Sequence, residues 1–144
     1  MTTTVPRPRP NINEDIRPFW DAVKERRFKL MRCQTCSAWY WPAAYCRFHA
    51  NEPFKGNMKW EEASGRGKVF AFNVHRKAFT PAFEAPYVYA LIELEEGPMF
   101  GSNVIGCRPE DVKIGMPVEV VFSDVEENLI LPQFHPSSIV CEPA

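Results

Sequence analysis

The chain has 144 residues, of which 45% are hydrophobic and 24% are charged, and its formal net charge is −1. This length accommodates one barrel-sized core with a small appendage, but it is short for two full domains. The near-neutral charge argues against a nucleic-acid-binding protein, because such proteins usually carry a marked basic excess.

The charge is unevenly distributed along the chain. Residues 1–50 contain nine basic and four acidic residues, whereas residues 51–144 contain eight basic and fourteen acidic residues. This asymmetry indicates an anionic ligand or an acidic partner near the front half, and a solvated charged helix is the alternative. No stretch approaches the roughly 18 apolar residues of a membrane span, and the first ten residues lack an apolar signal core. We therefore expect a cytosolic protein without membrane contact.

The N-terminal third is expected to hold an arm, a short helix and a strand. Residues 1–17 include three prolines within positions 6–10, which favours a flexible arm. Pro18 suits the first turn of a helix, on which Phe19, Trp20, Val23 and Arg27 share one stripe. Residues 28–32 then alternate apolar and basic side chains, as a short strand does.

The remaining chain predicts five strands, because apolar residues recur there with a period of two. In the first of them, Phe70, Phe72 and Val74 share one face and are expected to point into the core. Gly101 is expected to mark a bulge or bend, and residues 107–115 a single helical turn. The expected strands are residues 68–75, 87–94, 99–105, 117–122 and 129–134. Five strands with this insertion favour an OB-like barrel, and a small sandwich is the alternative.

The strongest chemical signal is formed by two closely spaced pairs, Cys33 with Cys36 and Cys46 with His49. A gap of two residues lets both side chains of a pair turn toward one ion, and two pairs complete a tetrahedron. Three thiolates and one imidazole suit zinc better than iron, and four protein ligands predict a structural role. The alternatives are a redox-active pair at Cys33 and Cys36, or a fourth ligand other than His49.

Aromatic side chains outside the predicted core suggest contact surfaces. Trp39, Tyr40 and Trp41 are more than a small ribbon can bury, so some are expected to pack on the barrel or on another protein. The loop 76–86 carries Phe79 and Phe83, which either cap the barrel core or contact an acyl group or a partner.

The whole layout resembles a known family, the zinc-ribbon and OB-fold acyl-CoA-associated proteins, also described as thiolase-associated proteins with a rubredoxin-like ribbon. The resemblance runs from Pro18 to Pro136, and the order and spacing of its pieces are specific although no single piece is. Members often carry four cysteines on the metal, whereas this chain has His49 at the fourth position. The matching pieces are Pro18–Trp20, the two ligand pairs, Ala85–Val88, Leu94–Gly97, Pro109–Val112, Gly115–Val118 and Leu131–Phe134.

The resemblance implies a mainly β fold with a short N-terminal helix, a rubredoxin-like zinc ribbon and a five-stranded OB barrel. We expect the arm in residues 1–17, the helix and ribbon in residues 18–60 and the barrel in residues 61–144. The resemblance also implies a non-catalytic subunit of a thiolase-like enzyme acting on acyl-CoA thioesters in acyl-chain or aromatic degradation, or a partner of a hydratase or retro-aldolase. The expected contacts with coenzyme A or the partner are Arg26, Arg27, Lys29, Arg32, Trp39, Trp41, Phe79 and Phe83.

Two other classes remain open. Ribbons and OB barrels also bind single-stranded nucleic acid through basic grooves and stacking aromatics, although the barrel half of this chain is acidic. A self-sufficient thioesterase or acyl transferase would need a nucleophile such as Cys107 or a base such as His75, for which the sequence shows no triad partner. We therefore expect no activity from this chain alone.

Overall fold

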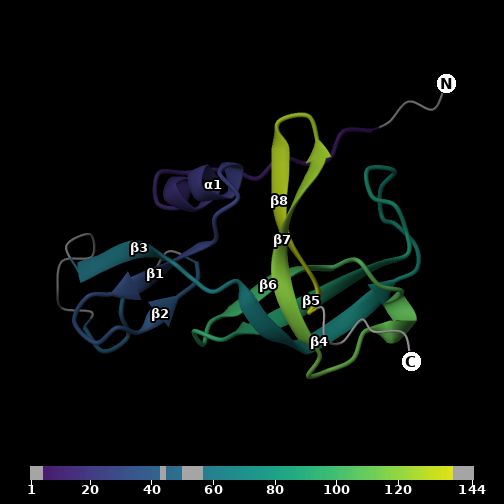
Figure 1. The fold of residues 1–144 in the computed structure, drawn as a ribbon. Coiled ribbons are helices and arrows are strands. Elements are labelled where there is room, and N and C mark those ends of the chain that lie inside the picture. The colour runs from purple at the N-terminus through teal and green to yellow at the C-terminus, as the bar shows by residue number, and fades with distance from the viewer. Residues whose placement is uncertain (1–4, 43–44, 50–56, 138–144) are drawn as a thin grey trace.

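The computed structural model describes residues 5–42, 45–49 and 57–137 and confirms the predicted mainly β fold (Figure 1). A three-stranded sheet and a closed five-stranded barrel lie side by side, with a short helix above them. The elements in chain order are α1 (Arg17–Lys24), β1 (Lys29–Cys33), β2 (Trp39–Tyr40), β3 (Met58–Glu62), β4 (Arg66–His75), β5 (Tyr87–Leu94), β6 (Met99–Val104), η1 (Pro109–Asp111), β7 (Pro117–Glu126) and β8 (Leu129–Pro136).

The helix buries one narrow apolar face. Phe19, Ala22 and Val23 are buried, and Pro18 lies in the first turn, where its missing N–H costs nothing. The predicted stripe was wrong at its end, because the helix stops at Lys24 and Arg27 therefore lies beyond it. The chain turns away at Arg26, whose φ is 59°. In the part of the chain that is described, no helix has the length and apolar character that a membrane crossing requires.

The ribbon is an antiparallel sheet in the order β2-β1-β3, with the two metal-ligand pairs at its end. Strand β1 begins one residue later than predicted. Strands β2 and β3 were not predicted. A two-residue strand is too short to show a period, and β3 carries only two apolar residues, Met58 and Trp60. These two strands hold β1 on both sides and so fix the direction of Cys33.

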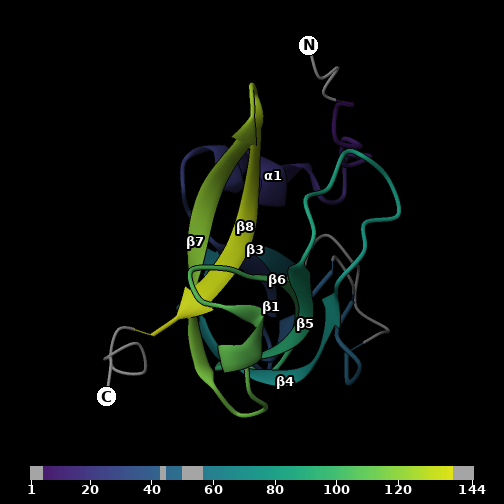
Figure 2. The same ribbon diagram turned by 90° about the vertical axis from the view of Figure 1, so that its right-hand side faces the viewer.

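The barrel strands follow the order β4-β5-β6-β8-β7, and all of their pairings are antiparallel except that between β6 and β8. Strand β5 has the predicted bounds, whereas β7 extends to Glu126 and β8 to Pro136. Strands β7 and β8 pair along their length and form a long hairpin, whose turn after Glu126 projects from the barrel (Figures 1 and 2). The loop 76–86 projects at the same end.

The predicted inward face of β4 was wrong at Phe70, whose side chain is 53% exposed. The pairing with β5 shifts register between Val69 and Ala71, which marks a β-bulge. One extra residue reverses the alternation, so Val69 is buried before the bulge while Phe72 and Val74 pack on the core after it.

Gly101 was predicted to mark a bulge or bend, and the bulge was wrong, because Gly101 pairs regularly with Leu91 in the β5–β6 ladder. A Cβ atom at Gly101 would lie 2.2 Å from the hydroxyl oxygen of Tyr89. Glycine at this position therefore leaves room for the Tyr89 side chain on the outer face of the barrel.

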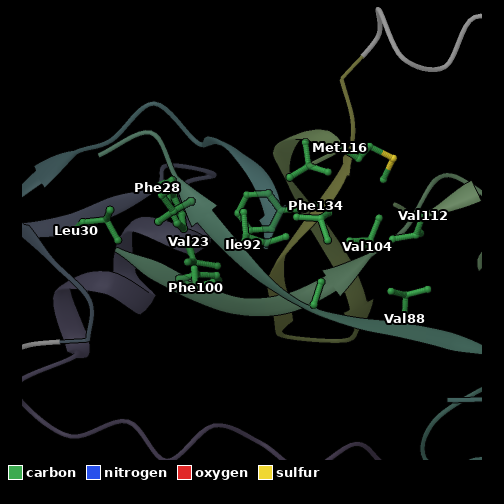
Figure 3. Packing of buried hydrophobic residues seen from close by; sticks show 14 of the residues in the cluster. Val23, Phe28, Leu30, Val88, Ile92, Phe100, Val104, Val112, Met116 and Phe134 are labelled. Carbon is green, nitrogen blue, oxygen red and sulfur yellow. The ribbon is translucent and has the colours of Figure 1, made fainter. Parts of the chain in front are cut away.

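One continuous core joins the helix, the start of β1 and the barrel. Its buried members include Val23 from α1, Leu30 from β1, and Phe100 and Phe134 from the barrel (Figure 3). A smaller cluster of Met31, Cys33, Cys46 and Met58 lies within the ribbon. The main core thus draws residues from both sides of position 60, where we expected the ribbon to end and the barrel to begin.

Candidate metal centre and interaction surfaces

The four predicted ligands converge at the end of the ribbon. The thiol sulfurs of Cys33, Cys36 and Cys46 and a ring nitrogen of His49 all lie within 4.8 Å of one another. The sulfur of Cys46 lies 3.4 Å from Nδ1 of His49 and 3.5 Å from the sulfur of Cys36. The sulfur of Cys33 lies 3.7 Å from the same Nδ1 atom.

Tight turns bring each pair together. The N–H of Ser37 donates to the carbonyl oxygen of Cys33 at 2.9 Å, and Ser37 itself has a φ of 65°. The N–H of Cys33 donates to the carbonyl oxygen of Ala38 at 2.8 Å, which closes the first turn. In the second pair, the N–H of His49 donates to the carbonyl oxygen of Cys46 at 3.3 Å.

The geometry fits a tetrahedral zinc ion. Zinc–sulfur bonds of about 2.3 Å and zinc–nitrogen bonds of about 2.0 Å give tetrahedral edges of roughly 3.8 Å between sulfurs and 3.5 Å between sulfur and nitrogen. Three of the six separations between the ligand atoms, at 3.4–3.7 Å, lie within a few tenths of an ångström of these edges. Because three thiols and one imidazole fill all four positions, such a site would leave no position for a reacting water.

Two polar side chains support the sulfurs from outside. The Tyr40 hydroxyl donates to the sulfur of Cys46 at 3.3 Å, and the Asn57 amide donates to the sulfur of Cys33 at 3.2 Å. Asn57 is itself fixed by the Thr35 hydroxyl, which donates to its Oδ1 at 2.8 Å. Asn57 was not predicted, because a single asparagine outside the two ligand pairs carries no spacing signal. Such outer contacts orient metal ligands and adjust their basicity.

The same contacts shift the acidities of the ligands. Burial alone would raise the pKa of the Cys46 thiol, but hydrogen bonds with Tyr40 and His49 outweigh it and lower that pKa to about 6. The hydrogen bond with Cys46 in turn raises the pKa of His49 above its usual value. Cys46 is therefore mainly a thiolate at neutral pH, which is the form that binds metal.

Carboxylates surround the basic residues that we expected to contact coenzyme A. Arg26 donates to Asp124 at 2.6 Å and to the carbonyl oxygen of Phe122 at 2.8 Å. Arg27 forms a hydrogen-bonded ion pair with Glu62, which raises the pKa of Arg27 and lowers that of Glu62. Each of these two arginines is therefore paired with a carboxylate of this chain.

The other two basic candidates lie on β1. Arg32 lies 3.7 Å from a carboxylate oxygen of Glu61, and its guanidinium stacks over the ring of Trp39 at 4.8 Å. Lys29 lies opposite Glu62 in the β1–β3 ladder and helps to lower the pKa of that carboxylate. All four positions therefore face acidic neighbours within this chain.

The tryptophans of the ribbon pack inward. The ring of Trp41 lies 4.3 Å from that of Phe19 and 4.9 Å from that of Phe100. Trp39 also packs on the main core, so both residues join the ribbon to the helix and barrel. Neither of them is among the strongly exposed aromatic residues.

Other aromatic side chains face outward. Phe79 in the loop 76–86 is 84% exposed, and Phe48 and Tyr45 beside the second ligand pair are 74% and 62% exposed. Ring contacts join the loop to the ends of β4 and β5. The ring of His75 stacks on that of Tyr87 at 4.6 Å and contacts that of Phe79 at 6.0 Å. Phe83, by contrast, lies against Tyr87 and under the guanidinium of Arg7. Only Phe79 of the two predicted loop residues is strongly exposed.

Comparison with known proteins gives two family matches that together cover the ribbon and most of the barrel. Residues 20–48 match the ChsH2 rubredoxin-like zinc ribbon domain, and residues 60–123 match the ChsH2 C-terminal OB-fold domain. A solved structure described as the Ltp2-ChsH2(DUF35) aldolase superposes with a TM-score of 0.79 at 38% identity. It covers 89% of this chain and 98% of the matched chain.

Two relatives set the scale of the similarity. A "DUF35 domain-containing scaffold protein" of Methanocaldococcus jannaschii is 39% identical over 76% of this chain and 77% of its own length. A "Probable enoyl-CoA hydratase alpha subunit" of Thermomonospora curvata is 38% identical over 91% of this chain. The match covers only 40% of that hydratase subunit, so this chain corresponds to less than half of it.

Proposed function

Because the chain belongs to the ChsH2 family of zinc-ribbon and OB-fold proteins, we propose that it is a non-catalytic scaffold subunit of an enzyme that acts on acyl-CoA thioesters. It contributes a rigid surface on which the catalytic subunit is held. The catalytic nucleophile and base then belong to the partner.

The observation that carries this proposal is the set of large apolar side chains that the fold leaves in water. Phe48, Phe79 and Ile114 are each more than 70% exposed, and none of them belongs to the core cluster of the described residues. Aromatic side chains held on a stiff framework are typical anchors of protein–protein interfaces, because little conformational entropy is lost when they bind.

The partner belongs to one of three enzyme classes. A thiolase-like enzyme is the partner that the family resemblance first suggested. The names of relatives also support an acyl-CoA hydratase or an aldolase, since two relatives are hydratase alpha subunits and the similar solved structure is an aldolase. The scaffold role that we propose is the same in each case.

The metal centre serves this role by fixing the ribbon. Cys33, Cys36, Cys46 and His49 would hold one zinc ion as a closed structural site. Zinc binding at such sites provides roughly 10–16 kcal/mol of apparent free energy, which is as large as the whole stability of many domains. The ion would therefore order a segment whose own apolar cluster is very small.

We also propose that basic residues of the front half contact coenzyme A, namely Arg26, Arg27, Lys29 and Arg32. The positive excess of the front half favours it. The acidic neighbours of these residues oppose it. A phosphate would have to displace these carboxylates from the arginines, or cations of the partner would have to offset their negative charge.

The test is co-expression of the tagged chain with each acyl-CoA enzyme subunit encoded beside it, followed by affinity capture and size-exclusion chromatography. A thiolase-like, hydratase or aldolase subunit that co-elutes in fixed stoichiometry would support the proposal. Elution of the chain alone in every combination, together with salt-dependent binding to a single-stranded oligonucleotide, would favour the nucleic-acid alternative instead.

A further inference from the structure

The segment before the helix lies against the two parts of the chain that project from the barrel. Residues 5–13 run past the turn of the β7–β8 hairpin toward the loop 76–86 (Figures 1 and 2). Pro6, Pro8 and Pro10 fix φ at every second position and favour an extended backbone. A chain restricted in this way loses less entropy when it lies on a surface.

Glu126, at the end of β7, binds two residues of this arm. Its Oε1 accepts the backbone N–H of Arg7 at 2.7 Å, and its Oε2 accepts the guanidinium of Arg9 at 3.2 Å. The same Arg9 nitrogen donates to the backbone carbonyl oxygen of Glu127 at 3.1 Å. The side chain of Glu126 is 25% exposed, so solvent screens these bonds less than it screens a fully exposed pair.

The local geometry of the hairpin separates Glu126 from the next carboxylate along the strand. The pairing of β7 with β8 shifts register between Asp124 and Glu126, which marks a β-bulge. Bulges of this kind redirect side chains. Asp124 pairs with Arg26 after the helix, whereas Glu126 binds the arm. The two carboxylates therefore hold different segments to the hairpin.

The arm also contacts the loop 76–86. The guanidinium of Arg7 lies 5.3 Å from the centre of the Phe83 ring, a cation–π contact. The N–H of Phe83 donates to the carbonyl oxygen of Thr80 at 3.3 Å, and the N–H of Ala82 donates to the Thr80 hydroxyl at 3.1 Å. Arg7 therefore contacts the tight turn that directly follows the exposed Phe79.

A hollow of about 650 Å³ lies between the loop and the hairpin. Its lining includes Phe83 from the loop, Val125 from the hairpin and Arg7 from the arm. Arg7 spans this gap, because its backbone is bonded to the hairpin while its side chain lies over the loop. The two contacts are arranged in series, so the position of the loop depends on the attachment of the arm.

We propose that the N-terminal arm is a strap, latched on Glu126, that holds the loop 76–86 across the hollow and so fixes the position of Phe79. The consequence for partner binding rests on the proposed scaffold function, in which Phe79 contacts the enzyme subunit. The latch is reversible, because its ion pair lies near the surface and is weakened by salt.

Three substitutions separate the two steps of the strap. Glu126→Ala removes the latch itself. Arg7→Ala keeps the backbone N–H that binds Glu126 but removes the guanidinium that lies over Phe83. Glu127→Ala is the matched control, because it removes a neighbouring carboxylate while Arg9 binds the backbone carbonyl oxygen at that position. An unchanged zinc content and thermal midpoint should show that each variant folds.

The experiment measures amide hydrogen exchange by NMR in the full chain, without a partner. We expect Glu126→Ala to speed exchange about tenfold at residue 7 and about threefold at Phe83. Arg7→Ala should speed exchange at Phe83 by a similar factor but leave residue 7 protected. Glu127→Ala should change neither, and 1 M salt should speed exchange at residue 7 in the unmodified chain. The affinity for the co-expressed enzyme subunit should fall about threefold in Glu126→Ala.

Different outcomes would overturn different steps. Unchanged exchange at residue 7 in Glu126→Ala would show that Glu126 is not the latch. Faster exchange at residue 7 with unchanged exchange at Phe83 would show that the arm does not hold the loop. If Phe83 is released but the complex keeps its affinity, the strap does not position Phe79 for the partner. If no acyl-CoA enzyme subunit binds the chain, the scaffold function fails, while the exchange rates decide on the strap independently.

Discussion

The ring of Trp41 lies 4.3 Å from the ring of Phe19, centroid to centroid, and this contact joins the ribbon to the helix. Phe19 in turn lies 6.1 Å from Phe100 in the barrel. The metal-binding segment is thus packed against the main core rather than linked to it by a free tether. Changes at the metal centre should therefore affect the stability of the whole chain.

Removing one metal ligand should release zinc and destabilise the chain. Cys46→Ser replaces a thiolate that contacts both Cys36 and His49, so we expect zinc content to fall from one ion per chain to near zero. Elemental analysis and a urea unfolding curve measure both effects. Cys107→Ser is the control, because Cys107 is not part of the ligand cluster. A Cys46→Ser variant that keeps a full zinc complement would contradict the assigned ligand set.

Zinc affinity should fall as the pH is lowered. The pKa of Cys46 is depressed to about 6, so the thiolate that binds metal is present above this pH and is lost as the pH falls through it. His49, whose pKa is raised, also has to lose its proton before Nδ1 can bind the ion. Chelator competition at pH 5, 6, 7 and 8 measures this dependence. An affinity that stays constant between pH 5 and 7 would show that protons do not compete at these ligands.

Phe19→Ala should strongly destabilise the protein. Phe19 is 1% exposed and contacts aromatic rings from the ribbon and the barrel, so its loss leaves a cavity where these parts meet. We expect the free energy of unfolding to fall by about 3–5 kcal/mol, which chemical denaturation can measure. Phe79→Ala, at an 84% exposed position, should change it by less than about 0.5 kcal/mol. Equal effects of the two substitutions would show that the core is assigned wrongly.

Phe79→Ala should weaken partner binding although it spares stability. A phenylalanine that is 84% exposed on a braced loop has the character of an interface anchor, and truncation of such anchors costs about 2 kcal/mol or roughly 30-fold in affinity. Titration of the purified partner by calorimetry gives this number. Phe70→Ala, which removes a phenylalanine exposed on β4, serves as the comparison. Unchanged affinity for Phe79→Ala would remove this loop from the interface.

Lys29→Glu should lower the affinity of the complex for coenzyme A if the front half contacts its phosphates. The loss of a charge-assisted contact corresponds to about tenfold in affinity, and the difference should shrink at high salt. Lys68→Glu, on the exposed side of β4, is the control. If both variants bind coenzyme A as the unmodified complex does, the contact with phosphates lies elsewhere.

The order of the elements and the metal ligands could be predicted because they depend on local patterns. The alternation of residues 87–94 gave the bounds of β5 correctly, and the spacing of the two ligand pairs predicted a convergence that the structure confirms. Such patterns involve residues that are close together in the sequence, so they can be recognised without knowing how the strand or the turn packs.

Features that depend on tertiary contacts could not be predicted in this way. The bulge between Val69 and Ala71 reverses the faces of β4, but it is defined by the pairing with β5 and leaves no mark on the local pattern. Asn57 reaches Cys33 across the ribbon, and Gln133 of β8 meets Asn103 of β6. Each of these contacts joins residues more than 20 positions apart, which sequence spacing cannot reveal.

We propose above all that this chain contributes structure and not chemistry to an acyl-CoA enzyme. The most direct measurement compares acyl-CoA turnover by the purified chain, by the co-encoded enzyme subunit and by the two together. We predict no turnover by the chain alone and a clear rise in the activity or stability of the enzyme subunit when the chain is added. Turnover by the isolated chain that Cys107→Ala abolishes would contradict the claim and identify a catalytic protein.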